Sequence, residues 1–387
     1  MSSTRSARPA PSAVDIGDPT DFPGAARLLG ARLGLRELAD GFALAYPRGE
    51  AWRQRLDVFT ARWERLVPGF DFRVVDNPAE ETLSLRISGS PAHRDRLGDL
   101  LSRPSATALR GALWKWRAHI ASRVATCLAR VLPDFLIIGA PKCGTDALFS
   151  YLGLHPAVRP GLWKEMHFFT ETFERGVWAY RAKFPTMAER RAVRARHGGF
   201  ATGEATPIYL VDPRVPMRVA ATLPHARFVA ILRNPVDRTY SQYQADRRAG
   251  RVTDSFEAVL DEEMRRIDTW RADYRSAPDG TGFLRRGSWA VAGSLYADQL
   301  EDWYRHVPAE RIHVVLGEDL RADHARVYRE VESFLGLPAA PVPVPGSFNQ
   351  YPYAPMVSAT RERLLEFFRL PNERLAALLG RSLPWTR

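Results

Sequence analysis

The sequence predicts an α/β protein in which helices flank a doubly wound parallel sheet. Three runs dominated by aliphatic residues carry this prediction: FLIIGA at 135–140, RFVAILR at 227–233 and RIHVVLG at 311–317. Continuous apolar runs of this length are typical of parallel strands buried on both faces. Segments with helical patterns lie between and after them, at 234–249, 255–272, 289–306 and 322–336. Doubly wound sheets bind ligands beyond the carboxyl ends of their strands, so the loops after Ala140 and Arg233 are where a site is expected.

The composition is that of a globular protein. The chain has 387 residues, of which 45% are hydrophobic and 26% charged, enough to bury a sizeable core. Its two cysteines, Cys127 and Cys143, fit neither a disulfide framework nor a zinc site. The polar N-terminal residues lack the apolar core of a signal peptide, and no apolar run approaches the roughly 18–20 residues of a membrane span. We therefore expect a cytoplasmic protein.

The formal net charge of +11 raises the question of nucleic-acid binding. The 55 basic residues are dispersed along the chain, without the clustered run of a nucleic-acid arm, and lysine occurs only at 115, 142, 164 and 183. We therefore expect no nucleic-acid partner. A basic surface suits a small anionic ligand equally well.

The N-terminal third predicts a separate small region. Residues 1–20 have the composition of a disordered tail, and 21–105 predict an accessory α+β region. Within that region we expect a helix over AARLLGARLGLRELADGF (25–42) and a second around Trp52–Trp63. The alternating segments FDFRVV and TLSLRIS, joined by DNPAEE, predict a β-hairpin.

Residues 106–131 predict a basic amphipathic helix that ends at Pro133. Trp114 and Trp116 flank Lys115 there, so contact with a membrane surface stays open. We favour a linker helix over 106–132 that packs on the domain formed by 133–387.

The loop after the first buried strand reads GAPKCGT from Gly139 to Thr145. A strand that runs through a glycine turn into a helix presents backbone N–H groups and a positive helix end to an anion. The loop is P-loop-like but does not follow GxxxxGK[ST], because Lys142 precedes Gly144. Taken alone, it could also be an ordinary turn between a strand and a helix. Cys143 has no evident partner base for a role as nucleophile.

The loop after the second buried strand begins with Arg233, and Ser241 follows eight residues later, about two turns into the predicted helix. Pro235 suits the first turn of that helix. An arginine fork matches a phosphate, and a serine hydroxyl adds a donor. Taken alone, this segment could equally be a surface arginine with a capping network.

Together, a PKxGT loop and an RxPxxRxxSxY segment some ninety residues later resemble the sulfotransferases that use 3′-phosphoadenosine 5′-phosphosulfate (PAPS). The resemblance covers about 133–385. It implies that Arg233 and Ser241 hold the 3′-phosphate, while the first loop holds the 5′-phosphosulfate. The implied residues of that loop are Pro141, Lys142, Cys143, Gly144, Thr145 and Asp146.

A third segment, KEMHFF, resembles the KExHFF motif of the glycan-type branch, which contains the heparan sulfate enzymes and many bacterial relatives. This resemblance implies that Glu165 is the catalytic base. His167 is the competing candidate, because the aryl and steroid sulfotransferases use a histidine. Alternate residues of an extended segment share a face, so both side chains should line one cleft. Lys142 would then neutralise the leaving group, and Lys164 with His167 would stabilise the transferred sulfuryl oxygens.

The sequence departs from the family pattern at two places. The basic glycine-containing loop that clamps the 3′-phosphate has no clear counterpart in 347–361, and no lysine occurs in GEATPIY around Glu204. We expect sulfuryl transfer to a hydroxyl of a sugar or glycosylated metabolite, with no required metal and with 3′-phosphoadenosine 5′-phosphate (PAP) as the product. A P-loop-type kinase using ATP and a non-catalytic nucleotide-binding module remain the alternatives.

Overall fold

The structure is a computed structural model that divides the chain into two compact units, Met1–Ala125 and Thr126–Arg387. The described residues are 18–19, 21–38, 41–67, 70–77, 80–89, 97–98, 100–102, 104–248, 251–269, 289–344 and 353–385.

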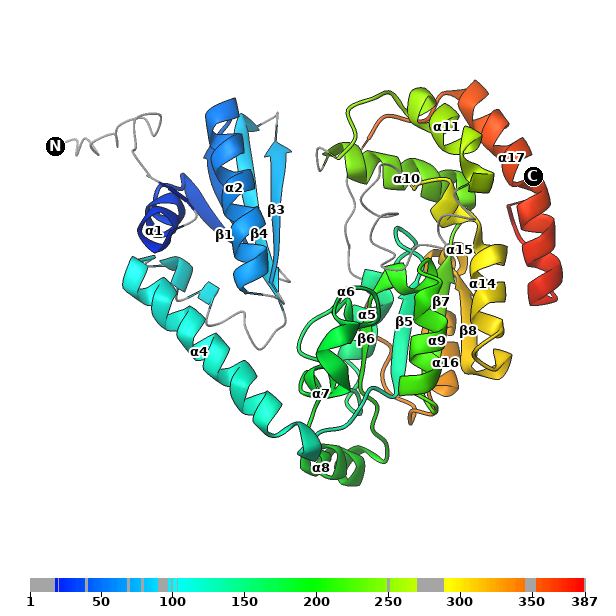
Figure 1. The fold of residues 1–387 in the computed structure, drawn as a ribbon, viewed down its shortest axis with the longest axis horizontal. Coiled ribbons are helices and arrows are strands. Elements are labelled where there is room, and N and C mark those ends of the chain that lie inside the picture. Colours follow the sequence, from blue (N-terminus) through cyan, green and yellow to red (C-terminus); the bar gives the residue numbers. More distant parts are fainter. Residues whose placement is uncertain are drawn as a thin grey trace. The chain divides into compact units, whose positions relative to one another are not determined.

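The first unit is an antiparallel sheet with the strand order β1-β2-β4-β3 and three described helices (Figure 1). Leucine and aromatic side chains of the sheet and of α2, among them Leu44, Leu56 and Phe59, form its core. Its elements are α1 Phe22–Gly30, β1 Gly34–Leu38, β2 Gly41–Pro47, α2 Glu50–Leu66, β3 Phe70–Asn77, β4 Thr82–Gly89 and α4 Ala106–Ala125.

The expected hairpin is confirmed as β3 and β4, and the aromatic-spaced helix as α2. The single helix expected over 25–42 is wrong beyond Gly30, because the chain there forms β1 and β2. The expected helix over 106–131 is also too long. It ends at Ala125 and is followed by a 3₁₀ turn, and α4 packs against α1 within the first unit.

The second unit contains a four-stranded parallel sheet with the order β6-β5-β7-β8 (Figure 1). The three strands expected from apolar runs are confirmed as β5 Phe135–Gly139, β7 Arg227–Leu232 and β8 Ile312–Leu316. All five residues of β5 are buried, as its continuous apolar run requires. The sequence did not reveal β6, a three-residue strand at Gly203–Ala205. Because the strands are parallel, the loops after them meet at one edge of the sheet.

Helices surround this sheet, and a second hydrophobic cluster joins α10, α11 and α17 through Tyr243, Phe256 and Phe368. Four expected helical segments are confirmed with shorter bounds, as α10, α11, α14 and α16. Among the described residues, no helix is long and apolar enough to span a membrane. The helices are α5 Thr145–Gly153, α6 Phe168–Glu171, α7 Gly176–Arg181, α8 Met187–His197, α9 Arg214–Thr222, α10 Pro235–Arg248, α11 Phe256–Arg265, α14 Tyr296–Tyr304, α15 Gly317–Ala322, α16 His324–Phe334 and α17 Ser358–Leu379.

Candidate active site

The loop between β5 and α5 has the geometry of an anion-binding turn. Gly144 caps α5 in the left-handed conformation, with φ at 104°, and no side chain hydrogen-bonds the first turn as a cap. Lys142 is also left-handed, with φ at 70°, a conformation that favours glycine. Thr145 is buried at the start of the helix. Amides at such a helix end can bind a phosphate or sulfate group.

Cys143 belongs to this loop but packs into the hydrophobic core. Its side chain is buried, and its Sγ is 3.8 Å from the hydroxyl of Tyr296. Burial is the main cause that raises the pKa of the Cys143 thiol to about 11. A thiol that stays protonated at neutral pH is a poor nucleophile, so the structure argues against a nucleophilic role.

Arg233 stands next to this loop, directly after β7. Its Nη1 is 3.5 Å from the carbonyl oxygen of Lys142, and its Nε is buried without a hydrogen-bond partner among the described residues. The N-terminus of α10 is already occupied, because Glu318 Oε1 accepts from the amide of Asn234 at 2.9 Å. Arg233 and the buried Ser241 are side chains of this segment that could donate to an anion.

Arg238 is a further residue of the second motif, and the sequence assigned it no role. Its guanidinium is fully buried on α10 and donates to the carbonyl oxygens of Pro141, at 3.2 Å, and Ala290, at 2.7 Å. Arg238 thereby links the α10 segment to the loop between β5 and α5. Gly317 closes the same region, because a Cβ there would lie only 2.8 Å from the carbonyl oxygen of Cys143.

The KEMHFF segment reaches the first loop through an ion pair. Lys164 Nζ lies 2.8 Å from Asp146 Oδ1 in the first turn of α5. The carboxylate of Asp146 is thus paired with a cation. The backbone amide of Asp146 is the group with which this residue can bind an anionic donor. The next residue, Glu165, donates its amide to the carbonyl oxygen of Ala205 at the end of β6, at 2.7 Å.

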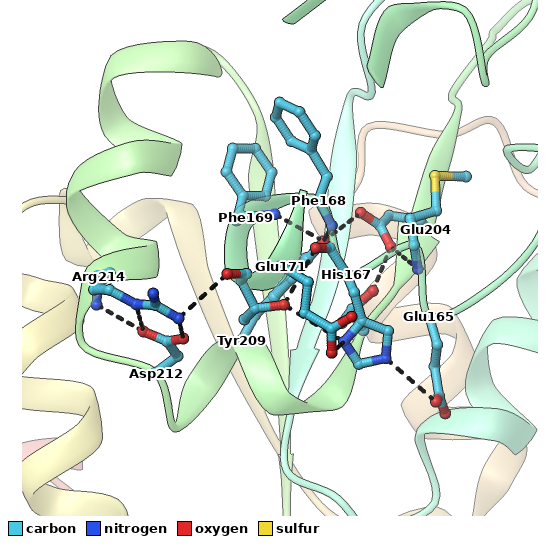
Figure 2. Close-up of polar contacts among 12 residues, drawn as sticks. Glu165, His167, Phe168, Phe169, Glu171, Glu204, Tyr209, Asp212 and Arg214 are labelled. Atoms are coloured by element: carbon cyan, nitrogen blue, oxygen red, sulfur yellow. Dashed lines mark hydrogen bonds and ion pairs between the residues drawn. The ribbon is translucent and has the colours of Figure 1, made fainter. Parts of the chain in front are cut away.

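Glu165 and His167 come together, although the segment is not extended as the sequence suggested. Both residues are left-handed, with φ at 55° and 49°. This turn places Glu165 Oε2 3.8 Å from His167 Nε2, while Glu171 Oε1 lies 3.7 Å from the other ring nitrogen (Figure 2). The Glu165 side chain is 47% exposed, which leaves its carboxylate accessible to a second substrate.

The environment of His167 favours the imidazolium ion. Burial alone would lower its pKa, but the hydrogen bond to Glu165 and the charges of Glu171, Glu165 and Glu204 outweigh that effect. The net result is a pKa of His167 raised above the usual 6.5. A protonated ring has no lone pair with which to accept a proton, whereas it can stabilise negative charge.

Glu204 is fully buried on β6 below this turn. Its carboxylate accepts hydrogen bonds from the hydroxyls of Tyr180, Tyr209 and Thr206 and from the amide of Met166. Burial and the Glu204 charge raise the pKa values of Tyr180 and Tyr209 well above 10, so both phenols stay protonated donors.

Lys183 supplies a cation close to this carboxylate. Its Nζ lies over the ring of Trp163, 5.3 Å from the centroid. Burial lowers its pKa to about 8, against the raising effect of Glu204. No pattern in the sequence marked Lys183, because it lies outside the motifs.

The structure therefore gathers the expected residues of the three motifs at one edge of the sheet, with Ser241 farther along α10. The segment 347–361 is where a 3′-phosphate clamp would be expected. Its first residues, 347–352, lie outside the described residues. Where the chain is described, no three His, Cys, Asp or Glu side chains are grouped to hold a metal ion.

Comparison with known proteins identifies the family. The family model described as the sulfotransferase domain matches residues 132–352, more than half of the chain. The chain belongs to the PAPS-dependent sulfotransferase family. Residues 1–131 lie outside the matched range.

Named relatives of this sulfotransferase include heparan sulfate glucosamine 3-O-sulfotransferase 6 of Homo sapiens. It is 30% identical over 280 residues, which cover 66% of this chain and 74% of that protein. The 3-O-sulfotransferase 3A1 of Mus musculus is 33% identical over 210 residues, 54% of this chain and 47% of that one, so the chain spans about half of its length. A sulfotransferase from Alicyclobacillus acidocaldarius has a solved structure with 31% identity and a TM-score of 0.50, covering 66% of this chain and 100% of that chain.

Proposed function

We propose that this sulfotransferase transfers the sulfuryl group of PAPS to a hydroxyl of a carbohydrate-containing acceptor, with Glu165 as the general base. The observation that carries the proposal is the juxtaposition of three motifs at the carboxyl edge of the parallel sheet. Arg233 contacts the backbone of Lys142, and Lys164 pairs with Asp146, so the two anion loops and the Glu165 turn form one site. The acceptor class rests on the similarity to heparan sulfate 3-O-sulfotransferases.

The donor would be held at both ends. The amides at the start of α5 and the Lys142 side chain suit the 5′-phosphosulfate, because they form a positive helix end with a cation. Arg233, whose buried Nε has no hydrogen-bond partner among the described residues, and Ser241 suit the 3′-phosphate. This second group distinguishes PAPS from ATP.

The reaction would proceed by in-line displacement at sulfur. Glu165 takes the proton of the acceptor hydroxyl while its oxygen forms a bond to sulfur, and the bond from sulfur to the 5′-phosphate oxygen breaks. Lys142 neutralises the charge that builds on that leaving oxygen, and His167 with Lys164 faces the sulfuryl oxygens. The raised pKa of His167 supports Glu165 over His167 as the base.

A matched pair of carboxylate variants tests the base. Glu165 and Glu171 flank opposite nitrogens of the same imidazole, so Glu165→Gln and Glu171→Gln each remove one charge beside His167. We expect E165Q to lose turnover by about 10²–10⁴-fold with unchanged PAP affinity, and E171Q to lose much less. The assay is transfer of radiolabelled sulfate from PAPS to oligosaccharide and phenolic acceptors. Substantial turnover by E165Q would move the base to His167.

Nucleotide competition tests the donor independently of any acceptor. PAP should bind tightly and ATP weakly, because ATP lacks the 3′-phosphate that Arg233 and Ser241 would hold. Tighter binding of ATP than of PAP would instead favour a kinase.

A further inference from the structure

We infer that Glu204 is a positioning residue for the catalytic turn, acting through Tyr209. The inference rests on the proposed role of Glu165 and deepens it. The backbone of Glu165 and of His167 adopts the left-handed conformation, although neither residue is glycine. Such residues persist only where the surrounding structure determines them strongly.

Glu204 and its neighbour Ala205 hold this turn from below. The carbonyl oxygen of Ala205 accepts the amide of Glu165 at 2.7 Å, and Glu204 Oε2 accepts the amide of Met166 at 3.3 Å. The first half of the turn is therefore fixed by two adjacent residues of β6.

Tyr209 fixes the second half. Its hydroxyl accepts the amide of Phe168 at 2.9 Å and donates its own proton to Glu204 Oε1 at 3.0 Å (Figure 2). The carboxylate of Glu204 thus holds the backbone on both sides of His167. It binds the amide of Met166 directly and the amide of Phe168 through the hydroxyl of Tyr209. The raised pKa of Tyr209 keeps that relay proton in place.

Tyr180 provides a matched control for Tyr209. Both side chains are fully buried, and both hydroxyls donate to Glu204 Oε1, at 2.8 Å and 3.0 Å. Tyr180 otherwise meets the turn through its ring, which stacks on Phe168 with centroids 4.2 Å apart. A phenylalanine keeps that ring contact, so Tyr180→Phe removes a donor to Glu204 without removing a bond to the turn.

Tyr209→Phe likewise removes one donor to Glu204 Oε1, and it also leaves the amide of Phe168 without its hydroxyl acceptor. We expect Y209F to lower kcat by about 10- to 100-fold, because small displacements of a catalytic group have effects of this size. Y180F should lower kcat about threefold or less. The PAP dissociation constant should stay within about twofold in both variants, and urea unfolding establishes that both are folded under the assay conditions.

Hydrogen exchange gives a readout that does not depend on activity. In full-length protein, amide exchange of a peptide covering Trp163–Thr170 should be about tenfold faster in Y209F and close to wild type in Y180F. Equal kcat losses in the two variants, or equal exchange of this peptide, would overturn the inference. If the wild type itself transfers no sulfate, the proposed function fails, and the exchange comparison still decides whether Glu204 and Tyr209 hold the turn.

Discussion

Arg238 offers a sharp test of how the two anion loops are held together. Its buried guanidinium donates to Pro141 O and Ala290 O, and it also reaches Ser294 Oγ at 3.1 Å and Gln242 Oε1 at 3.4 Å. Burial lowers its pKa, which reflects the unfavourable desolvation of the charge. The perturbation is a pair of substitutions, Arg238→Lys and Arg238→Met, which separate the charge from the hydrogen bonds.

The lysine variant should be the less stable of the two. Lysine keeps a buried charge, but its single nitrogen cannot span Pro141 O and Ala290 O, which Arg238 reaches from Nε and Nη1. About two hydrogen bonds from a charged donor are then lost, at roughly 1.5–3 kcal/mol each. We expect R238K to lose about 3–6 kcal/mol of unfolding free energy.

The methionine variant removes the charge and leaves few acceptors unsatisfied. Ala290 O still accepts from the hydroxyls of Thr239 and Ser294, and those two hydroxyls lie 2.9 Å apart. Pro141 O, which keeps the Cys143 thiol at 3.6 Å, and Gln242 Oε1, which lies 3.4 Å from the guanidinium, lose their donor from Arg238. Together this costs about 1–3 kcal/mol, and relief of the buried charge offsets part of it. We therefore expect R238M to lose about 1–2 kcal/mol.

The assays are urea unfolding at neutral pH and calorimetric titration with PAP. Both variants release Pro141, so both should bind PAP more weakly than the wild type. The assigned roles of the Arg238 charge and hydrogen bonds would be refuted if R238K had the unfolding free energy of the wild type, or if R238M were less stable than R238K.

Two further predictions concern pH. The raised pKa of His167 predicts that kcat of the wild type falls at alkaline pH as the imidazolium loses its proton. The variant H167Q should have a lower kcat but should lack this alkaline decrease. An unchanged alkaline decrease in H167Q would contradict the prediction. The pKa of Lys183, lowered to about 8 from 10.5, means that the unfolded chain binds more protons than the folded chain between these values. The unfolding free energy of the wild type minus that of K183M should therefore rise with pH above about 8, by at most about 1.4 kcal/mol per pH unit. A difference that does not change with pH would rule this out.

The parallel sheet could be predicted because its central strands are buried on both faces. The apolar runs at β5, β7 and β8 each mark a strand to within a residue or two at either end. In contrast, β6 is three residues long and carries the buried Glu204, so its sequence has no apolar run. The sequence predicts too long an N-terminal helix because leucines at helical spacing continue into β1. The chain instead forms two paired strands, with Leu38 of β1 opposite Gly41 of β2.

The site could be predicted at the level of its motifs but not of its backbone. Lys142, Arg233 and Glu165 lie in motifs whose residue types match an anionic donor and a base. Glutamate and histidine have no intrinsic preference that would place Glu165 and His167 in the left-handed region. That geometry depends on β6 and on the hydroxyl of Tyr209, which lie about forty residues later in the chain.

The arrangement of carboxylates shows how one site can hold an anionic donor and still contain a base. Asp146 is paired with Lys164, and Glu318 accepts from the amide at the start of α10. Glu204 is enclosed by four donors below the surface. Each of these carboxylates is thereby compensated before a donor binds. Glu165 differs because the group beside it is the imidazole ring of His167, at 3.8 Å, and its own side chain is about half exposed. A carboxylate that is held by its backbone and remains accessible at its oxygens can take a proton from an acceptor, which is why the geometry of the turn matters more for turnover than for donor binding.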